Sequence, residues 1–254
     1  MKKINKIVGV LLVVILSGMV SMTAQTPTGK EIVQKAQDKI NGLSSQGIMK
    51  MTVVRPAWSR DVTMKSWSKG DDYYLILITS PARDKGQVFL KREFDMWNWM
   101  PSISRMIKIP PSMMSQSWMG SDFTNDDLVK MNSYVNDYTH KVIGDKTIDG
   151  IDCYKIEMIP LPDAAVVWGK VLVWIAKEEY YQLRIEFYDE DMLLVNREIC
   201  SEIKQMGDRK LPSKMVMEPV NKEGHKTIIE ISEMEFNKPF PEGFFSQQNM
   251  KKVR

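Results

Sequence analysis

The pattern of apolar and polar positions predicts one helix followed by a long series of short β-strands. A capping box at Thr28 and Glu31 begins the helix. Apolar residues then recur at helical spacing from Ile32 to Ile40, and Asn41-Gly42 marks the end. We therefore expect one amphipathic helix of about 12 residues at the start of the folded part of the chain.

β-like runs occupy most of the remaining sequence between Gly47 and Phe236. The run from Tyr73 to Thr79 is dense in β-formers and stops at Ser80-Pro81, and Asp149-Gly150 is a strong hairpin signal. Short polar turns separate the runs, which together predict about eleven antiparallel strands. This spacing is typical of one large sheet, curled or closed. The expected fold class is mainly β with a few helices.

The middle of the chain breaks this pattern. Residues Ser112 to Val135 are loop-like and partly helical, and Thr124 to Asp127 can cap a short helix that runs through Met131. An irregular segment of this length inside a meander usually has a function, such as a lid or a binding loop.

The N-terminus has the features of a secretory signal peptide. Lys2, Lys3 and Lys6 precede an apolar run from Ile7 to Val20, and small residues lead to Ala24. The run is shorter than the ~20 residues that a membrane-spanning helix needs, although an uncleaved anchor is the alternative. We expect residues 1–24 to be a signal peptide and residues 25–254 a single domain, located in the periplasm of a Gram-negative cell.

Charge and residue types exclude several classes of function. The formal net charge of +3 comes from the three lysines of residues 1–24, and the rest of the chain is balanced. A nucleic-acid-binding protein would keep a basic face to neutralise phosphates. Two histidines, with no nucleophile elbow, phosphate loop or zinc motif, give little support for catalysis. We expect neither an enzyme nor a bound cofactor.

The densest apolar and aromatic cluster lies between Phe94 and Met119. On a strand, Trp97 and Trp99 share one face. Met96 and Met100 share the other face, so both faces are largely apolar, whereas a half-exposed strand has one polar face.

We interpret this cluster as an apolar cavity with a flexible, methionine-lined lid. Methionine is unbranched and polarisable, and it suits a surface that must fit ligands of variable shape; the chain has 20 methionines. Plain core packing is the alternative. The residues expected to line the cavity or lid are Trp97, Trp99, Met100, Ile103, Met106, Met113, Met114, Trp118 and Met119.

Three arginines lie near this cluster, namely Arg83, Arg92 and Arg105. A basic rim on an apolar cavity would suit an anionic lipid headgroup, so we consider them candidates for headgroup contact. The alternative is that they are solvated surface charges.

The sulfur-containing residues leave two further questions. Cys153 and Cys200 lie in two separate β-like runs and either form a disulfide or remain as buried thiols. Methionine pairs such as Met49/Met51 and Met215/Met217 could bind Cu(I), but they are scattered and have no His-rich tract beside them. We therefore expect no metal site.

Several motifs resemble one known family. They are Asp84-Lys-Gly86, Asp95-Met-Trp97-Asn-Trp-Met-Pro101, Gln116-Ser-Trp-Met-Gly-Ser-Asp122, the hairpin Gly144 to Tyr154, Glu235-Phe236-Asn237 and Phe244-Phe245-Ser246. The series is similar to the outer-membrane lipoprotein-sorting proteins of the LolA-like family, over nearly the whole chain after residue 24.

The resemblance implies a fold and a function. The implied fold is a half-open antiparallel β-barrel whose helices form a lid over a hydrophobic cavity. The implied function is that of a non-enzymatic periplasmic carrier, which binds acyl chains of lipoproteins or lipids and transfers them toward the outer membrane with transient membrane contact. The alternative is an accessory subunit that docks on an inner-membrane transporter of the resistance-nodulation-division type.

Overall fold

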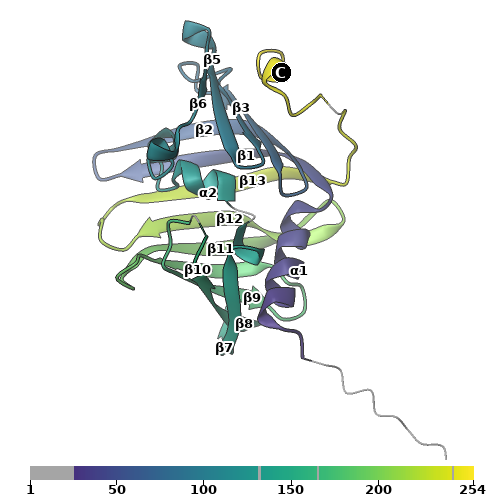
Figure 1. Ribbon diagram of the computed structural model, residues 1–254, viewed down its shortest axis with the longest axis vertical. Coiled ribbons are helices and arrows are strands. Elements are labelled where there is room, and N and C mark those ends of the chain that lie inside the picture. The colour runs from purple at the N-terminus through teal and green to yellow at the C-terminus, as the bar shows by residue number, and fades with distance from the viewer. Residues whose placement is uncertain (1–25, 131–132, 165, 242) are drawn as a thin grey trace, which may run out of the picture.

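Thirteen strands form one antiparallel sheet in the computed structural model, which describes residues 26–130, 133–164, 166–241 and 243–254 (Figure 1). The expected signal peptide at residues 1–24 lies outside the described residues. The strands are β1 (Ser44–Arg55), β2 (Trp58–Lys69), β3 (Tyr73–Ser80), β4 (Val88–Arg92), β5 (Asp95–Met100), β6 (Arg105–Lys108), β7 (Tyr138–Ile148), β8 (Ile151–Pro160), β9 (Lys170–Ala176), β10 (Gln182–Tyr188), β11 (Leu194–Met206), β12 (Arg209–Pro219) and β13 (Lys226–Phe236).

The strand order brings the first and last strands together at the centre of the sheet and leaves the sheet open at its edges. It runs β6-β5-β4-β3-β2-β1-β13-β12-β11-β10-β9-β8-β7, so the first and last strands pair at the centre. The two edges, β6 and β7, do not pair with each other in the described part of the chain. The expectation of about eleven strands was too low, since thirteen strands pair in the sheet, and the short runs predicted at β4 and β6 are both among them. The sheet is curled and open rather than closed.

β-bulges contribute to the curl of this large sheet. The register shifts at Ile48/Met49 in β1, at Thr63/Met64 in β2 and at Val142/Gly144 in β7. An extra residue on one strand bends it and increases the local twist. The sheet therefore has a hollowed inner face, which a helix and the connection between β6 and β7 cover.

The pairing of β1 with β13 divides the sheet into a first half, strands β1–β6, and a second half, strands β7–β13. Helix α1 (Gly29–Asn41) lies on the inner face over the second half (Figure 1). The predicted capping box is confirmed, because the Thr28 side chain and the Glu31 side chain each accept a hydrogen bond from the other's backbone N–H. Ile32, Val33 and Ala36 are fully or almost fully buried, and they belong to one core cluster with residues of β8, β9 and β10. The apolar stripe of the helix is thus what attaches it to the sheet.

Residues 109–130 and 133–137, here called the crossing segment, lie between the two edge strands in the sequence. β6 and β7 are consecutive in sequence but lie at opposite edges, and Trp118, Phe123 and Leu128 of the residues between them line the cavity on the inner face. The crossing segment contains the 3₁₀ turns η2 (Pro111–Met113), η3 (Trp118–Gly120) and η4 (Ser133–Val135) and the helix α2 (Asn125–Lys130). The predicted cap is present, since the backbone N–H of Asp127 donates to Thr124 Oγ1 at 3.1 Å.

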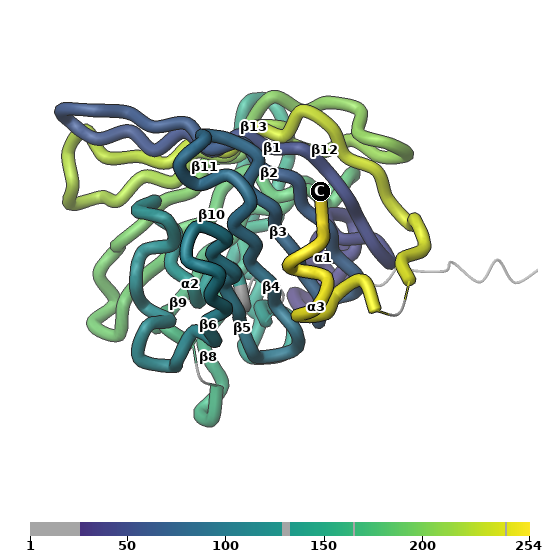
Figure 2. The backbone as a smooth tube through the Cα atoms, turned by 90° about the horizontal axis from the view of Figure 1, so that it is seen from above, coloured from purple at the N-terminus to yellow at the C-terminus, as the bar shows by residue number. Residues whose placement is uncertain are grey.

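The C-terminal segment, residues 237–241 and 243–254, covers the outer face of the first half of the sheet. It includes the short helix α3 (Gln247–Met250), which contacts β4. Figure 2 shows this segment (yellow) alongside β3 and β4. Phe245, Met250 and Val253 are buried against the outward-facing residues of β3 and β4. The first half of the sheet is therefore covered on both faces.

The two cysteines remain free, buried thiols. Cys153 lies on β8 and Cys200 on β11, and β9 and β10 lie between these strands. Strands about 4.8 Å apart place β8 and β11 about 14 Å from each other. A disulfide needs Cα atoms within about 7 Å, so this sheet order excludes the bond.

Candidate functional site

A cavity of about 220 Å³ lies between the inner face of the sheet, α1 and the crossing segment. Its walls are mostly apolar and come from both halves of the sheet. The sheet contributes Met49, Met64, Ile76, Ile185, Phe187, Leu211, Met215, Met217, Ile229, Ile231 and Met234, α1 contributes Ile40, and the crossing segment contributes Trp118, Phe123 and Leu128. A pocket of this composition suits an apolar ligand.

Methionines of the central strands are a main part of this wall. Met49 on β1, Met64 on β2, Met215 and Met217 on β12, and Met234 on β13 all line the cavity. The sequence analysis placed the methionine-lined surface between Phe94 and Met119 and did not assign these five residues to it. The pairs at alternate positions, Met49/Met51 and Met215/Met217, were the signal that could have located them, since such residues share one strand face.

The crossing segment brings three of the predicted site residues to the inner face. Trp118 lines the cavity, and its ring meets that of Phe89 edge-on with 5.4 Å between centroids. Met114 and Met119 pack against the same core cluster. Trp118 therefore lies where the sequence analysis expected a cavity residue.

Three other predicted residues lie on the outer face of the sheet. Trp97, Trp99 and Met106 pack in the cluster formed with the C-terminal segment, where Lys251 lies 5.3 Å above the Trp99 ring. Both faces of β5 are apolar because the crossing segment covers one and the C-terminal segment covers the other. Lipid contact by these side chains stays a prediction, but the cavity described above is on the opposite face.

The remaining predicted residues do not converge on the cavity. Ile103 is 55% exposed in the turn before β6, and Met100 and Met113 are half-buried outside the cavity wall. Arg83 pairs with Asp84 in the loop after β3, while Arg92 stacks on the Tyr73 ring at 5.8 Å. Arg105 is exposed on the edge strand β6. The three arginines thus lie on separate elements, and their contact with a headgroup stays a prediction.

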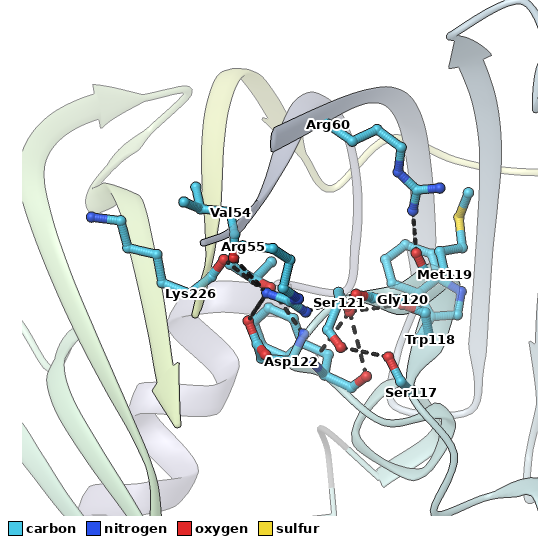
Figure 3. A network of polar contacts seen from close by, with 12 residues as sticks. Val54, Arg55, Arg60, Ser117, Trp118, Met119, Gly120, Ser121, Asp122 and Lys226 are labelled. Atoms are coloured by element: carbon cyan, nitrogen blue, oxygen red, sulfur yellow. Dashed lines mark hydrogen bonds and ion pairs between the residues drawn. The ribbon is translucent and has the colours of Figure 1, made fainter. Parts of the chain in front are cut away.

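A buried ion pair attaches the crossing segment to the sheet (Figure 3). Arg55, at the end of β1, lies 3.0 Å from the Asp122 carboxylate, and the Thr227 hydroxyl of β13 donates to the same carboxylate at 2.7 Å. The Arg55 guanidinium also donates to the carbonyl of Gly120 at 2.8 Å. The side chains of Arg55 and Asp122 are only 12% and 6% exposed. Charge-assisted hydrogen bonds in such a setting are strong, so this pair fixes the segment over the cavity.

A second arginine extends this attachment. The guanidinium of Arg60 on β2 donates to the carbonyl of Met119 (Figure 3). The same guanidinium lies 4.0 Å from the Asp84 carboxylate. The sequence analysis singled out neither Arg55 nor Arg60, because a single arginine in a β-like run has no distinguishing local pattern.

Ionisable groups also line the cavity. Glu198 on β11 accepts a hydrogen bond from the Cys200 thiol at 3.5 Å, and burial raises the pKa of its carboxyl to about 7. Burial also raises the pKa of Asp127, which accepts hydrogen bonds from the Thr124 backbone N–H at 2.7 Å and from Trp168 Nε1 at 3.2 Å. Sequence reasoning missed these carboxyls as cavity groups.

No group of three or more potential His, Cys, Asp or Glu ligands comes together within the described ranges. His140 packs beside the crossing segment, where its Nε2 lies 2.7 Å from the carbonyl of Tyr134, and burial lowers its pKa. This histidine holds η4 in place.

Solved structures of similar fold come from several bacteria. A protein of the DUF1329 family from Desulfovibrio piger matches with a TM-score of 0.80 and 24% identity, covering 87% of this chain and 97% of that one. A domain from Vibrio parahaemolyticus assigned to outer membrane lipoprotein sorting matches with a TM-score of 0.77 and 25% identity, over 88% and 98%. A LolA superfamily protein from Nitrosomonas europaea matches with a TM-score of 0.75 and 24% identity, over 88% and 100%.

Sequence comparison gives the family. Among the curated proteins, none matches the chain. A family model whose description reads "-like: Uncharacterized protein" matches residues 70–252, well over half of the chain. The chain therefore belongs to this family, and its fold is that of the LolA-like outer membrane lipoprotein-sorting proteins.

Proposed function

We propose that the protein is a non-enzymatic periplasmic carrier, which binds the acyl chains of lipoproteins or lipids and transfers them toward the outer membrane. The observation that carries the proposal is the apolar cavity enclosed by α1, the crossing segment and the inner face of the sheet. Exposing an acyl chain to water costs roughly 0.8 kcal/mol per CH₂ group. A carrier must therefore bury much of the chain, and these walls offer that burial.

In this proposal the crossing segment acts as a lid. It covers the cavity, and both polar contacts, chief among them the ion pair between Arg55 and Asp122, and the packing of Trp118 on Phe89 attach it to the sheet. Breaking the polar contacts and withdrawing Trp118 from its packing would free residues 117–124 without disturbing the strand ladder beneath them. A carrier needs such a step, because a ligand enclosed on all sides can neither be loaded nor released.

The similarity to a domain assigned to outer membrane lipoprotein sorting supports this direction of transport. The expected signal peptide and this similarity together support a location in the periplasm. None of the helices in the described ranges is long and apolar enough to cross a membrane.

A pair of substitutions tests the proposal. Met215→Asp places a carboxylate in the cavity wall and should weaken binding of a neutral fluorescent probe such as phenylnaphthylamine at least tenfold, because a charge in an apolar wall is costly. The matched control is Met192→Asp, at a loop position that is 48% exposed, and it should bind the probe as the wild type does. Circular dichroism checks that both variants fold. Wild-type affinity in a folded Met215→Asp variant would refute the cavity as the binding site.

Docking on an inner-membrane transporter is the second candidate function. Two large apolar side chains at the ends of β5, Phe94 and Ile103, are 87% and 55% exposed, and such positions suit contact with a partner protein. This function predicts that replacing both with Ser abolishes co-purification with the transporter while probe binding in the cavity is unchanged. Loss of probe binding, with co-purification retained, would contradict it.

A further inference from the structure

One carboxyl group stands in an otherwise apolar part of the cavity wall. Glu198 lies on β11 between Ile185 of β10 and Met217 of β12, its direct neighbours across the two ladders. Both neighbours are apolar and line the cavity with it. The Glu198 residue is only 8% exposed, so water does not solvate the carboxyl freely.

The described residues leave much of the hydrogen-bonding capacity of the Glu198 carboxyl unused. Among the described residues, the Cys200 thiol is its hydrogen-bond donor, at a sulfur–oxygen distance of 3.5 Å. A thiol is a weak donor, and a buried carboxylate normally accepts several stronger hydrogen bonds. Asp127 shows the contrast, because it accepts from a backbone N–H and from an indole N–H. Glu198 therefore retains acceptor capacity on a surface that faces the cavity.

We propose that the Glu198 carboxyl is the polar anchor of the cavity and selects lipids whose buried polar group donates a hydrogen bond, such as an amide or a hydroxyl, over free fatty acids. This inference rests on the proposed function and names the chemistry of its ligand. A donor from the ligand supplies the hydrogen bond that the wall lacks. A fatty-acid carboxylate instead brings a like charge next to Glu198.

The preference for amides or hydroxyls over fatty acids depends on pH, because the Glu198 carboxyl, with a pKa of about 7, titrates near neutrality. The other ionisable groups lining the cavity, among the described residues, are Tyr73, Tyr74, Lys91, Asp127, Tyr134 and Cys200. Asp127 acts in the same direction as burial, since its negative charge also raises the pKa of Glu198. When protonated, Glu198 can donate to a fatty-acid carboxylate. When ionised, it repels that carboxylate but still accepts from an amide.

Competition with phenylnaphthylamine tests the inference, with oleamide and oleate as the two probes. At pH 8 we expect wild-type protein to bind oleamide at least tenfold more tightly than oleate, because an amide donates a hydrogen bond to the ionised Glu198, whereas oleate brings a like charge next to it. Between pH 6 and pH 8, oleate should lose about tenfold in affinity, whereas oleamide should change little. Equal affinities for the two probes at pH 8 would overturn the inference.

Glu198→Gln should bind oleate equally at pH 6 and pH 8 and should lose most of the preference for oleamide. The matched control is Glu218→Gln. Glu218 lies opposite Arg197 in the register of β11 and β12, and Arg197 is next to Glu198 on the strand, so Glu218 points to the other face of the sheet. If the oleate affinity of Glu198→Gln still falls between pH 6 and pH 8, the inference is overturned, whereas the proposed function stands. Failure of the wild type to bind phenylnaphthylamine or either lipid would overturn the proposed function together with the inference.

Discussion

Replacing Glu198 with Gln should remove a pH-dependent penalty from the stability of the fold. Burial in the cavity wall raises the pKa of this carboxyl from 4.5 to about 7. At about 1.4 kcal/mol per pKa unit, this difference corresponds to about 3 kcal/mol. The folded state binds the Glu198 proton more tightly than the unfolded chain does. Protonated Glu198 therefore stabilises the wild-type fold, and this contribution is fully present below pH 4.5 and is lost as the pH rises through 7.

Urea denaturation followed by tryptophan fluorescence at pH 5, 6, 7 and 8 measures this effect. Relative to the wild type, Glu198→Gln should gain about 2–3 kcal/mol in the free energy of unfolding between pH 5 and pH 8. The difference between the two proteins isolates Glu198, because the other titrating groups are common to both. Glu218→Gln should show no comparable change. A Glu198→Gln difference that is the same at pH 5 and pH 8 would refute the reasoning.

Three further predictions follow from the packing. Asp122→Asn leaves a buried guanidinium without its counter-charge and should destabilise the attachment of the crossing segment by about 3 kcal/mol or more, seen as faster amide exchange in residues 117–124; unchanged exchange would contradict this. Phe245→Ala should lower the free energy of unfolding by about 3–5 kcal/mol, whereas Phe94→Ala should stay within about 0.5 kcal/mol, and similar losses would contradict the placement of the C-terminal segment. Alkylation under non-reducing, denaturing conditions should label both Cys153 and Cys200, and an unlabelled protein would reveal a disulfide.

Local signals in the sequence predicted the elements that depend on neighbouring residues. The capping box at Thr28 and Glu31 specifies the start of α1 through contacts three residues apart, and the structure confirms it. Turn residues such as Asp149-Gly150 end β7 and begin β8 for the same reason. The break in the pattern after Pro111 marked the crossing segment. Its place became clear only from the strand order, because the pairing of β1 with β13 joins residues that are far apart in sequence.

The candidate site was harder to predict, since an apolar pattern indicates burial and does not identify the covering element. Trp97 and Trp118 carry the same signal in sequence. In the structure the C-terminal segment covers Trp97, whereas Trp118 lines the cavity. Similarly, neither Arg55 nor Glu198 belongs to a recognisable motif in its β-like run. Their importance depends on partners from other elements, namely Asp122 and the apolar neighbours on β10 and β12.

Native mass spectrometry of the mature protein, purified from periplasm without detergent, tests the carrier function most directly. We expect a stoichiometric ligand that contains acyl chains, and extraction followed by lipid analysis then identifies its class. A ligand-free mass, with no uptake of added phospholipid or lipopeptide, would contradict the account and favour docking on a transporter.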